Sequence, residues 1–361
     1  MTPPASTPPR ISVVMATYGR AEIIPETLRR LNAQTLADHE FEVIVVDDGS
    51  PDDTQRVLAE AAAWMRCRYR WMSHANAGPG HTQNRGIAEA AAPLVLLIAD
   101  DILLAPQALA AHLAQHRAHP EPGAAVLGRV LQSPALTQSV FLRTWDPFRF
   151  DSFEGLQQLP YYLFWACNVS FKRDFMLQHG MFHARRGRAG AAAHEDAELG
   201  YRLHQHGLQL YLAMDGLGHH HHVETLDGAM KRAHQRGLNW GEFRERVPTP
   251  EIVVRYHVLG WDTLGDHWRA LTGPGRRFLI GADRNPLLLV LRYLLRSLLF
   301  NRLTLPGLWL PLLRRAEQQP ALARWVHRDL YRGVISWHFF KGVHDAVALY
   351  GQPGTEPGHA G

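Results

Sequence analysis

The sequence has few cysteines, few lysines and no long hydrophobic run. Its two cysteines, Cys67 and Cys167, cannot build a disulfide framework or a thiolate zinc site, and their scarcity favours a reducing compartment such as the cytoplasm. The net charge of +4, with lysine at only three of the 38 basic positions, indicates no nucleic-acid partner. The longest uncharged apolar runs, 285–291 and 303–313, are shorter than the roughly 18 residues of a membrane-spanning helix, so we expect no span.

What the sequence does have is the composition of a folded protein with a short tail. It contains 361 residues, of which 46% are hydrophobic and 20% charged, and this is enough apolar material for a core. Residues 1–10 read MTPPASTPPR, with four prolines and no apolar stretch. We therefore expect a disordered tail there, and neither a signal peptide nor a membrane anchor.

Short β-branched runs alternate with longer helical stretches from residue 11 onward. The spacing predicts strands at 11–15, 41–46, 68–72, 94–99, 168–170 and 208–213, and helices at 22–34, 54–66, 80–91 and from 194. Strand and helix in units of about 30 residues predict an α/β fold with right-handed crossovers and a parallel sheet covered on both faces. Ligands bind such sheets at the carboxyl ends of the strands.

Acidic pairs follow two of these strands. The pair at 47–48 precedes a Gly-Ser turn, and two interpretations stay open: an Asp that caps the next helix, or a carboxylate that binds a ribose hydroxyl or a base imide. The pair at 100–101 ends a buried strand, where two adjacent carboxylates repel each other unless a cation intervenes. One cap for the helix near Pro106 explains only one of them. The pair therefore favours a site for Mg²⁺ or Mn²⁺ with a bound diphosphate.

Two further motifs carry groups that are suited to catalysis. The helix that opens at residue 194 contains Glu195 and Asp196 in its first turn. It is either an ordinary acidic helix start or the place of a general base, in which Glu195 opposes the dipole's lowering of the Asp196 pKa. Four histidines follow at 219–222. In an extended segment His220 and His222 share one face, so they are either solvent-facing or able to supply one imidazole to a metal.

Together these motifs resemble those of family 2 glycosyltransferases, which have the GT-A fold. The matching segments are, in chain order, ISVVMATYGR, VIVVDDGS, NAGPGHTQNRGI, LLIADD and HEDAELGYRL. Their order and spacing over residues 11–222 are more specific than any single motif. The resemblance implies a GT-A type α/β domain at 11–225, with a mainly parallel sheet flanked by helices, and a helical C-terminal extension at 226–361.

The resemblance also implies a role for each matching residue. A nucleotide-diphosphate sugar donor would bind across the first half of the domain, and Asp101 would hold Mn²⁺ or Mg²⁺ through the donor's diphosphate. Asp196 would be the catalytic base, with Glu195 beside it, and His220 or His222 would be an additional metal ligand. The predicted donor-binding residues are Ala16, Thr17, Tyr18, Asp48, Asn76, Gly78, Asn84, Arg85 and Asp100.

The sequence departs from the family pattern in two places. Gln83 stands where the family usually carries arginine, and Arg85 is the candidate to replace it. The Gly-Gly-Phe-Asp stretch that often precedes the catalytic helix reads Gly-Met-Phe-His at 180–183, and an arginine- and alanine-rich loop follows at 185–193. The family therefore does not indicate which acceptor is recognised.

The chemistry that these residues predict is glycosyl transfer with inversion. An oxocarbenium-like centre needs charge neutralisation on the leaving diphosphate and a base on the opposite face of the sugar. We expect the acceptor to be a hydroxyl of a glycan, a lipid-linked molecule or another glycoconjugate, in cell-surface polysaccharide or glycoconjugate synthesis. The alternatives are a catalytically silent nucleotide-sugar or glycan-binding module, which would have lost a carboxylate site, and a sugar nucleotidyltransferase, which would need a lysine in the loop at 16–20.

The C-terminal third carries the positive charge. Residues 251–361 contain 14 basic and 8 acidic residues, and residues 269–315 contain nine basic residues and one acidic residue. This stretch includes the segments PLLLVLRYLLRSLLF and LTLPGLWLPLL. Two interpretations stay open: a helical cap on the catalytic domain with solvated arginines, or a peripheral membrane contact on anionic lipid at the inner face of the cell membrane.

Overall fold

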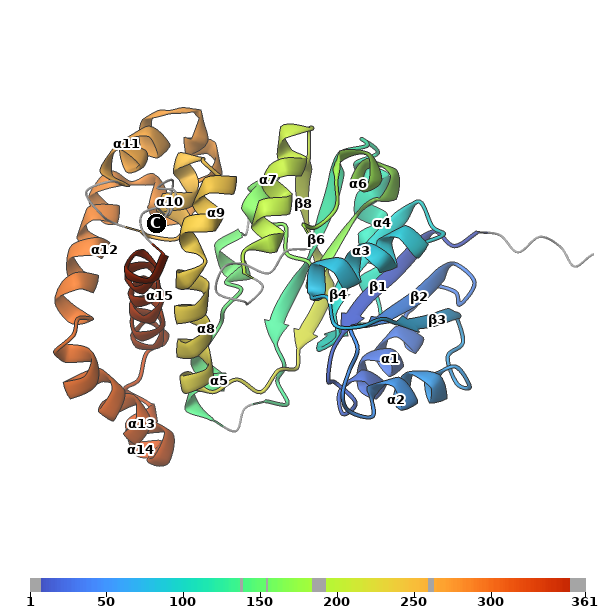
Figure 1. Ribbon diagram of the computed structural model, residues 1–361, viewed down its shortest axis with the longest axis horizontal. Coiled ribbons are helices and arrows are strands. Elements are labelled where there is room, and N and C mark those ends of the chain that lie inside the picture. Colours follow the sequence, from blue (N-terminus) through green and yellow to red (C-terminus); the bar gives the residue numbers. More distant parts are fainter. Residues whose placement is uncertain (1–7, 137–138, 154, 184–192, 259–262, 351–361) are drawn as a thin grey trace, which may run out of the picture. The chain divides into compact units, whose positions relative to one another are not determined.

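The computed structural model describes residues 8–136, 139–153, 155–183, 193–258 and 263–350 (Figure 1). Residues 1–7 of the tail predicted at 1–10, and residues 185–192 of the loop at 185–193, lie outside the described residues. The chain forms two compact units. The first comprises Met1–Ser133, Glu154–Arg185 and Glu195–His222, and the second comprises Pro134–Phe153, Arg186–His194 and Val223–Gly361. The long part of the second unit begins near the predicted boundary at 225, but no sequence pattern announced its two shorter segments.

The first unit is built on a mixed sheet of eight strands in the order β3-β2-β1-β4-β7-β6-β8-β5. The strands are β1 (Ile11–Thr17), β2 (Phe41–Asp47), β3 (Arg68–Ser73), β4 (Leu94–Ala99), β5 (Ile102–Leu104), β6 (Ala124–Gln132), β7 (Asn168–Lys172) and β8 (Gln209–His220). The strands β3, β2, β1 and β4 are parallel, as predicted. Strand β7 runs antiparallel to β4 and β6, β8 is parallel to β6, and β5 is antiparallel to β8. The predicted α/β class with flanking helices is confirmed.

The helices of the first unit are α1 (Ile24–Asn32), α2 (Thr54–Ala61), α3 (Pro79–Glu89), α4 (Ala108–Ala118), α6 (Arg173–His179) and α7 (Glu195–Gln205). Helix α2 ends five residues before the predicted boundary at Arg66, because its last turn tightens into i→i+3 bonds such as Trp64 N to Ala61 O. Helix α3 packs closely on the central strands, since a Cβ on Gly86 would clash with Val14 of β1. Strands β1 and β2 are buried on both faces, which explains their unbroken apolar runs.

The second unit is helical, as predicted for the extension. Its helices are α5 (Val140–Thr144), α8 (Leu226–Leu238), α9 (Trp240–Arg246), α10 (Pro250–Arg255), α11 (Leu264–Thr272), α12 (Pro286–Leu299), α13 (Leu310–Gln318), α14 (Pro320–Ala323) and α15 (Arg328–Tyr350). Helices α8 and α15 approach through two glycines: a Cβ on Gly237 would clash with the carbonyl of Phe339, and one on Gly342 with the carbonyl of His234. Helix α5 joins this unit because the carboxylate of Glu317 accepts the backbone N–H groups of Val140 and Phe141.

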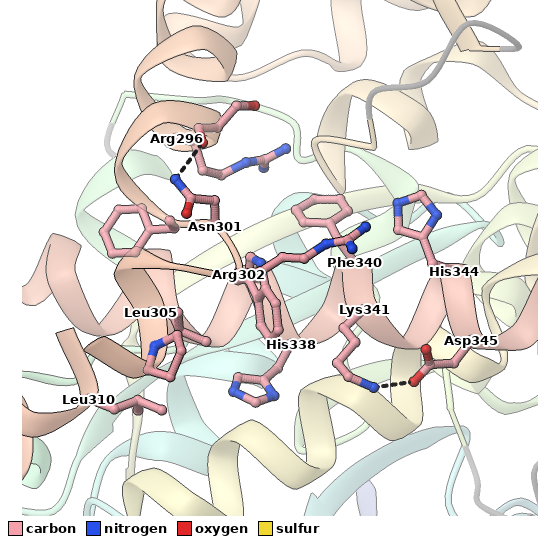
Figure 2. Close-up of a pocket in the computed structure, with 14 residues that line it drawn as sticks. Arg296, Asn301, Arg302, Leu305, Leu310, His338, Phe340, Lys341, His344 and Asp345 are labelled. Carbon is pink, nitrogen blue, oxygen red and sulfur yellow. Dashed lines mark hydrogen bonds and ion pairs between the residues drawn. The ribbon is translucent and has the colours of Figure 1, made fainter. Parts of the chain in front are cut away.

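Helix α12 directs its two arginines toward other protein groups and most of its leucines toward solvent. It buries Leu289 and Tyr293, while Arg292 pairs with Asp283 and Arg296 donates to the carbonyl oxygen of His257. The two arginines of this helix are therefore partly buried and paired with protein groups, and the two interpretations of residues 269–315 stay predictions. Its C-terminal end and α15 line a cavity of about 900 Å³ (Figure 2). Within the described part of the chain, no helix has both the length and the apolar character that crossing a membrane requires.

Candidate active site

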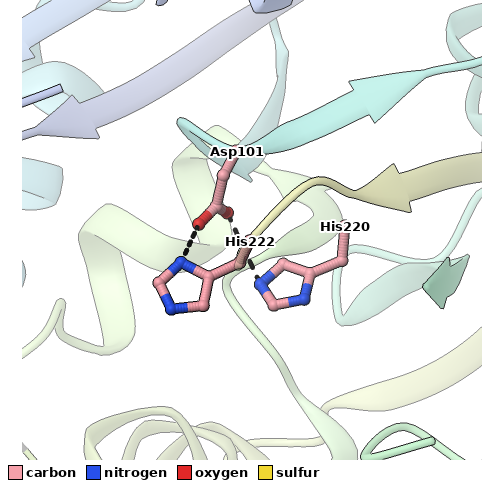
Figure 3. A group of neighbouring side chains, drawn as sticks. All are labelled: Asp101, His220 and His222. Atoms are coloured by element: carbon pink, nitrogen blue, oxygen red, sulfur yellow. Dashed lines mark ion pairs between the residues drawn. The ribbon is translucent and has the colours of Figure 1, made fainter. Parts of the chain in front are cut away.

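Three side chains that can ligate a metal meet at one edge of the sheet. Nδ1 of His222 lies 3.3 Å from Oδ2 of Asp101, and Nε2 of His220 lies 3.7 Å from Oδ1 of Asp101. Figure 3 shows both imidazoles turned toward the carboxylate. One ligand atom from each residue lies within 4.8 Å of the other two. Asp101 is buried and the two histidines are partly exposed, so the cluster is anchored in the protein and reachable from solvent.

The sheet explains why these residues meet. Strand β5 follows Asp101 directly and pairs with the end of β8, which places Ile102 opposite His220. The backbone N–H of His221 then donates to the carbonyl oxygen of Asp101 at 2.7 Å. Because alternate residues of an extended chain point to opposite sides, the ring of His221 faces away and contacts Oγ of Ser133 at 3.0 Å. The predicted shared face of His220 and His222 is present in the structure.

The other carboxylate of the acidic pair, Asp100, is held by two threonines and an arginine that precede it in the chain. Oγ1 of Thr17 donates to Oδ2 of Asp100 at 2.7 Å, and Oγ1 of Thr27 donates to its carbonyl oxygen at 2.6 Å. The guanidinium of Arg20 lies between the two carboxylates, with Nε 3.5 Å from Asp100 and Nη2 3.4 Å from Asp101. A cationic side chain thus offsets part of the repulsion between two adjacent buried acids.

The two acids differ electrostatically. Burial and the neighbouring charge of Asp101 raise the pKa of Asp100 to about 6, against the hydrogen bond from Thr17. Burial also acts to raise the pKa of Asp101. The hydrogen bond from His222 and the charges of His220 and Arg20 outweigh burial and hold that pKa below its usual range. The more stable anion is therefore the carboxylate beside the histidines, which is the form that binds a metal.

The acidic pair at the end of β2 divides the two roles that the sequence left open. Asp47 is buried and accepts hydrogen bonds from the backbone and side chain of Ser50 and from Gln55, so it closes the turn. Asp48 instead reaches the loop before α3. Its carboxylate accepts the N–H groups of Ala77 at 2.8 Å and Gly78 at 3.0 Å, and the side-chain amide of Asn76 at 3.0 Å. The structure thus brings Asp48, Asn76 and Gly78 together.

Other predicted donor-binding residues lie around this edge with different surroundings. Ala16 is half-buried in β1, and Tyr18 is 51% exposed just beyond it. Asn84 uses both atoms of its amide on the backbone of Phe182, at 2.8 and 2.9 Å, so it ties α3 to that segment. Arg85 is exposed and donates to the carbonyl oxygen of Ser73 at 3.3 Å. The donor-binding roles of these four residues stay predictions.

The predicted base lies in the first turn of α7, as expected from its acidic start. Oδ2 of Asp196 accepts the backbone N–H of Ala166 at 3.1 Å. The next residue, Cys167, accepts the N–H of Ala99 through its carbonyl oxygen at 3.2 Å. Asp196 and Asp101 also both act to raise the pKa of the Cys167 thiol, after burial itself. Asp196 is therefore close to the end of β4 and its acidic pair. Glu195 precedes it and approaches Gly80 at the start of α3.

Two features of the site escaped the sequence-based predictions. The first is Arg20, whose only sequence signal is that it closes the ISVVMATYGR segment. The second is a polar network beneath β7, in which Oγ of Ser170 contacts Nδ1 of His112 and Nε2 of His116, both at 2.8 Å. Asn168 completes it with a 3.2 Å contact to His112. Isolated histidines in a helix carry no pattern from which this network can be inferred.

The donor set of the cluster fits a divalent cation. One carboxylate and two imidazoles are common ligands of first-row transition metals, and Mn²⁺ also accepts carboxylate and phosphate oxygens. Ligand nitrogens suit Mg²⁺ less well, because Mg²⁺ prefers oxygen in octahedral geometry. The donor set of Asp101, His220 and His222 therefore fits a divalent cation.

Comparison with known proteins gives the class. Mannosyltransferase PcManGT from Pyrobaculum calidifontis, solved in complex with GDP-Man and Mn²⁺, superposes with a TM-score of 0.55 over 96% of this chain and 88% of that chain, at 16% sequence identity. This likeness shows the fold alone, and the fold is of the GT-A type.

Comparison by sequence gives the family. The model of the family described as Glycosyl transferase family 2 matches residues 12–176. Validoxylamine A glucosyltransferase of Streptomyces hygroscopicus subsp. jinggangensis is 31% identical over 280 residues, which cover 68% of this chain and 63% of that protein. The uncharacterized glycosyltransferase YfnE of Bacillus subtilis is 25% identical over 252 residues, 57% of this chain and 63% of that protein.

Residues 12–176 of the chain belong to glycosyl transferase family 2, as the sequence motifs predicted. The chain spans about three fifths of the length of the curated validoxylamine A glucosyltransferases that it matches.

Proposed function

We propose that this protein is a metal-dependent, inverting glycosyltransferase that moves a sugar from a nucleotide-diphosphate donor to an acceptor hydroxyl. The observation that carries the proposal is the cluster of Asp101, His220 and His222 near Asp196, within one unit of a family 2 fold. The Mn²⁺ and GDP-Man in the structure of PcManGT support the same donor class. The complete set of carboxylates disfavours a silent binding module, and the loop at 16–20 without lysine disfavours a nucleotidyltransferase.

The ligands and the acids have separate tasks in this proposal. Asp101, His220 and His222 would hold Mn²⁺ or Mg²⁺, which neutralises charge on the leaving diphosphate when bound. Asp100 accepts a hydrogen bond from Thr17 and shares the guanidinium of Arg20 with Asp101. These contacts would keep the end of β4 in place. Asp48 orders the loop at 76–78, whose backbone would face the nucleoside.

Asp196 is the proposed general base. It sits at the N-terminal end of α7, and the backbone N–H of Ala166 donates to its carboxylate and orients it. A base of this kind takes the proton of the acceptor hydroxyl as the hydroxyl attacks the anomeric carbon. Attack from the side opposite to the leaving diphosphate inverts the configuration at that carbon. Glu195 lies beside the proposed base in the first turn of α7.

The exposed leucines of the second unit support a peripheral contact with lipid through residues 269–315. Ten large hydrophobic side chains between Leu287 and Leu308 are at least 41% exposed, and such patches mark interaction surfaces. Contact with the inner face of the cell membrane would bring a lipid-linked acceptor within reach, in the synthesis of a polysaccharide or glycoconjugate.

The metal site is tested by titrating UDP and GDP into the protein with and without Mn²⁺, by calorimetry. We expect Mn²⁺ to strengthen binding of one of them, and Asp101→Asn to weaken the metal-dependent part by about 100-fold or more. Asp174→Asn is the matched control, because Asp174 is 97% exposed in the same unit. Equal affinity with and without Mn²⁺, or an unaffected Asp101→Asn variant, would contradict the metal assignment.

A further inference from the structure

The outer face of α12 is an aliphatic surface. Leu287, Leu291, Leu294 and Leu298 follow each other at helical spacing and are 79%, 51%, 64% and 70% exposed. Their neighbours Val290 and Leu295 are also exposed. Leu303 and Leu308, which follow α12 in the chain, are 84% and 51% exposed. Covering these side chains with another apolar surface would remove them from water and so stabilise the helix.

The inner side of the same helix opens on a cationic cavity. Of its 14 lining residues, Arg296, Arg302 and Lys341 carry a positive charge, and Asp345 is the carboxylate among them (Figure 2). Asp345 accepts hydrogen bonds from Lys341 at 2.5 Å and from His234 at 2.7 Å. Its charge is therefore already matched, and the two arginines give the cavity a net positive charge.

Arg296 is the most informative residue of the cavity. Its guanidinium lies 4.0 Å from the centre of the Phe340 ring and donates to the carbonyl oxygen of His257. Burial lowers the pKa of Arg296 to about 10, helped by the charge of Arg292, so the side chain remains charged at neutral pH. Among the described residues no carboxylate pairs with it. A partly buried guanidinium without a carboxylate is costly unless an anion completes the site.

We propose that the second unit docks on an anionic lipid surface, with the outer face of α12 in the interfacial layer and a phosphate-bearing headgroup in the cavity. The inference deepens the lipid contact proposed above and rests on it. The aromatic walls of the cavity, Phe300, Phe340 and Trp337, suit the carbon part of such a headgroup. Arginine suits its phosphate, because the planar guanidinium forms two parallel hydrogen bonds with phosphate oxygens.

Charge favours lipid over other occupants. Between residues 269 and 315 the single carboxylate, Asp283, is buried and paired with Arg292 at 2.5 Å. Arg276, Arg277, Arg284, Arg302 and Arg315 are exposed there. A second copy of the chain across a two-fold axis would bring this positive surface against itself. A protein partner is usually gripped through Trp, Tyr and Arg anchors, whereas this face presents leucine and valine. Anionic headgroups above an acyl layer match both the charge and the aliphatic face.

The docking face is tested by co-sedimentation of the full chain with vesicles of phosphatidylcholine, with and without phosphatidylglycerol. We expect binding to the phosphatidylglycerol vesicles only, and a loss of about tenfold or more in Leu294→Gln/Leu298→Gln. The matched control is Leu177→Gln/Met214→Gln, at positions that are 39% and 40% exposed in the first unit. Binding to neither vesicle, equal binding to both, or unchanged binding of the α12 variant would overturn the proposal.

The cavity is tested by measuring vesicle binding of the double variant Arg302→Gln/Lys341→Gln. The control is Arg68→Gln/Arg117→Gln, which removes two cations from the surface of the first unit. We expect only the cavity variant to lose about tenfold in binding to phosphatidylglycerol vesicles. Titration of inorganic phosphate and of glycerol 1-phosphate separates the two sources of the anion. Inorganic phosphate that binds as tightly as vesicles would overturn the lipid assignment, and equal losses in both double variants would overturn the cavity. All four variants should keep Mn²⁺-dependent nucleotide binding, so failure here is distinguishable from failure of the proposed transferase site.

Discussion

The two units place charge and apolar surface in opposite ways. In the first unit the leucines and valines of β1, β2 and β4 are buried, and the carboxylates collect at the strand ends beside Arg20 and two histidines. In α12 of the second unit, Arg292 and Arg296 turn toward protein partners and most of the leucines turn outward. The comparison shows that leucine content alone does not place a segment in a core. Both faces of a central strand are buried, so all of its apolar residues enter the core. A helix at the surface buries one face only, and its leucines can lie on the exposed face.

The largest expected effect concerns the carboxylate of α7. Asp196→Asn removes the proposed base without changing the shape of the side chain, so kcat should fall by about 10²- to 10⁴-fold. Metal-dependent nucleotide binding should remain, because Asp196 is not among the ligands. The measurement is transfer from a nucleotide sugar under saturating donor, with Asp174→Asn as the exposed control. Unchanged turnover in Asp196→Asn would reject the base assignment.

The second prediction compares how a leucine of each unit contributes to the free energy of unfolding. Leu28 in α1 is fully buried, and Leu294 in α12 is 64% exposed. Leu28→Ala should lower the free energy of unfolding by about 2–5 kcal/mol, because it leaves a cavity. Leu294→Ala should change it by less than about 0.5 kcal/mol in the absence of lipid. Chemical denaturation of both variants decides this. A large loss in Leu294→Ala would mean that α12 is covered in solution.

The third prediction concerns the contact between α8 and α15. A Cβ at residue 342 would meet the carbonyl of His234, which is backbone and cannot move aside as a flexible side chain would. We therefore expect Gly342→Ala to destabilise the second unit by about 1–3 kcal/mol. Gly307→Ala is the control, since a Cβ there meets nothing within 4 Å. The measurement is thermal unfolding. Equal melting temperatures of the two variants would contradict the close approach of these helices.

The smallest expected effect comes from mild acid. Burial lowers the pKa of His112 to about 4 and that of His116 to about 3, with Lys172 adding to the effect on His116. The unfolded chain binds these protons near pH 6.5, so stability is retained above that pH and declines as pH falls toward 4. Each histidine should contribute about 1 kcal/mol for each pH unit below 6.5.

The measurement for this prediction is the melting temperature between pH 7 and pH 5.5. His116→Gln should show a shallower decline than the wild type, whatever its absolute stability. His81→Gln should not change the slope, because His81 is exposed. Parallel slopes in all three proteins would contradict the burial of neutral histidines.

The fold of the first unit could be predicted because its signals are local. Apolar runs such as 94–99 allow only a buried strand, and strand periodicity places His220 and His222 on one face whatever the rest of the chain does. Arg20 could not be assigned, because its position between Asp100 and Asp101 depends on two strands that are far apart in sequence. The orientation of α12 could not be predicted either. With leucine on most sides, its pattern defines no face, and its inward arginines depend on Asp283 and His257.

The second unit contains two segments from the middle of the chain, and this limits how the protein can be divided. Phe141 of α5 stacks edge-on against Tyr331 of α15, and Glu317 of α13 holds the start of α5. A protein cut after His222 would keep every proposed metal ligand, yet it would expose Phe141 and leave the N–H groups of Val140 and Phe141 without their carboxylate. The first unit is therefore not a module that truncation can isolate or that can be fused as it stands to another extension.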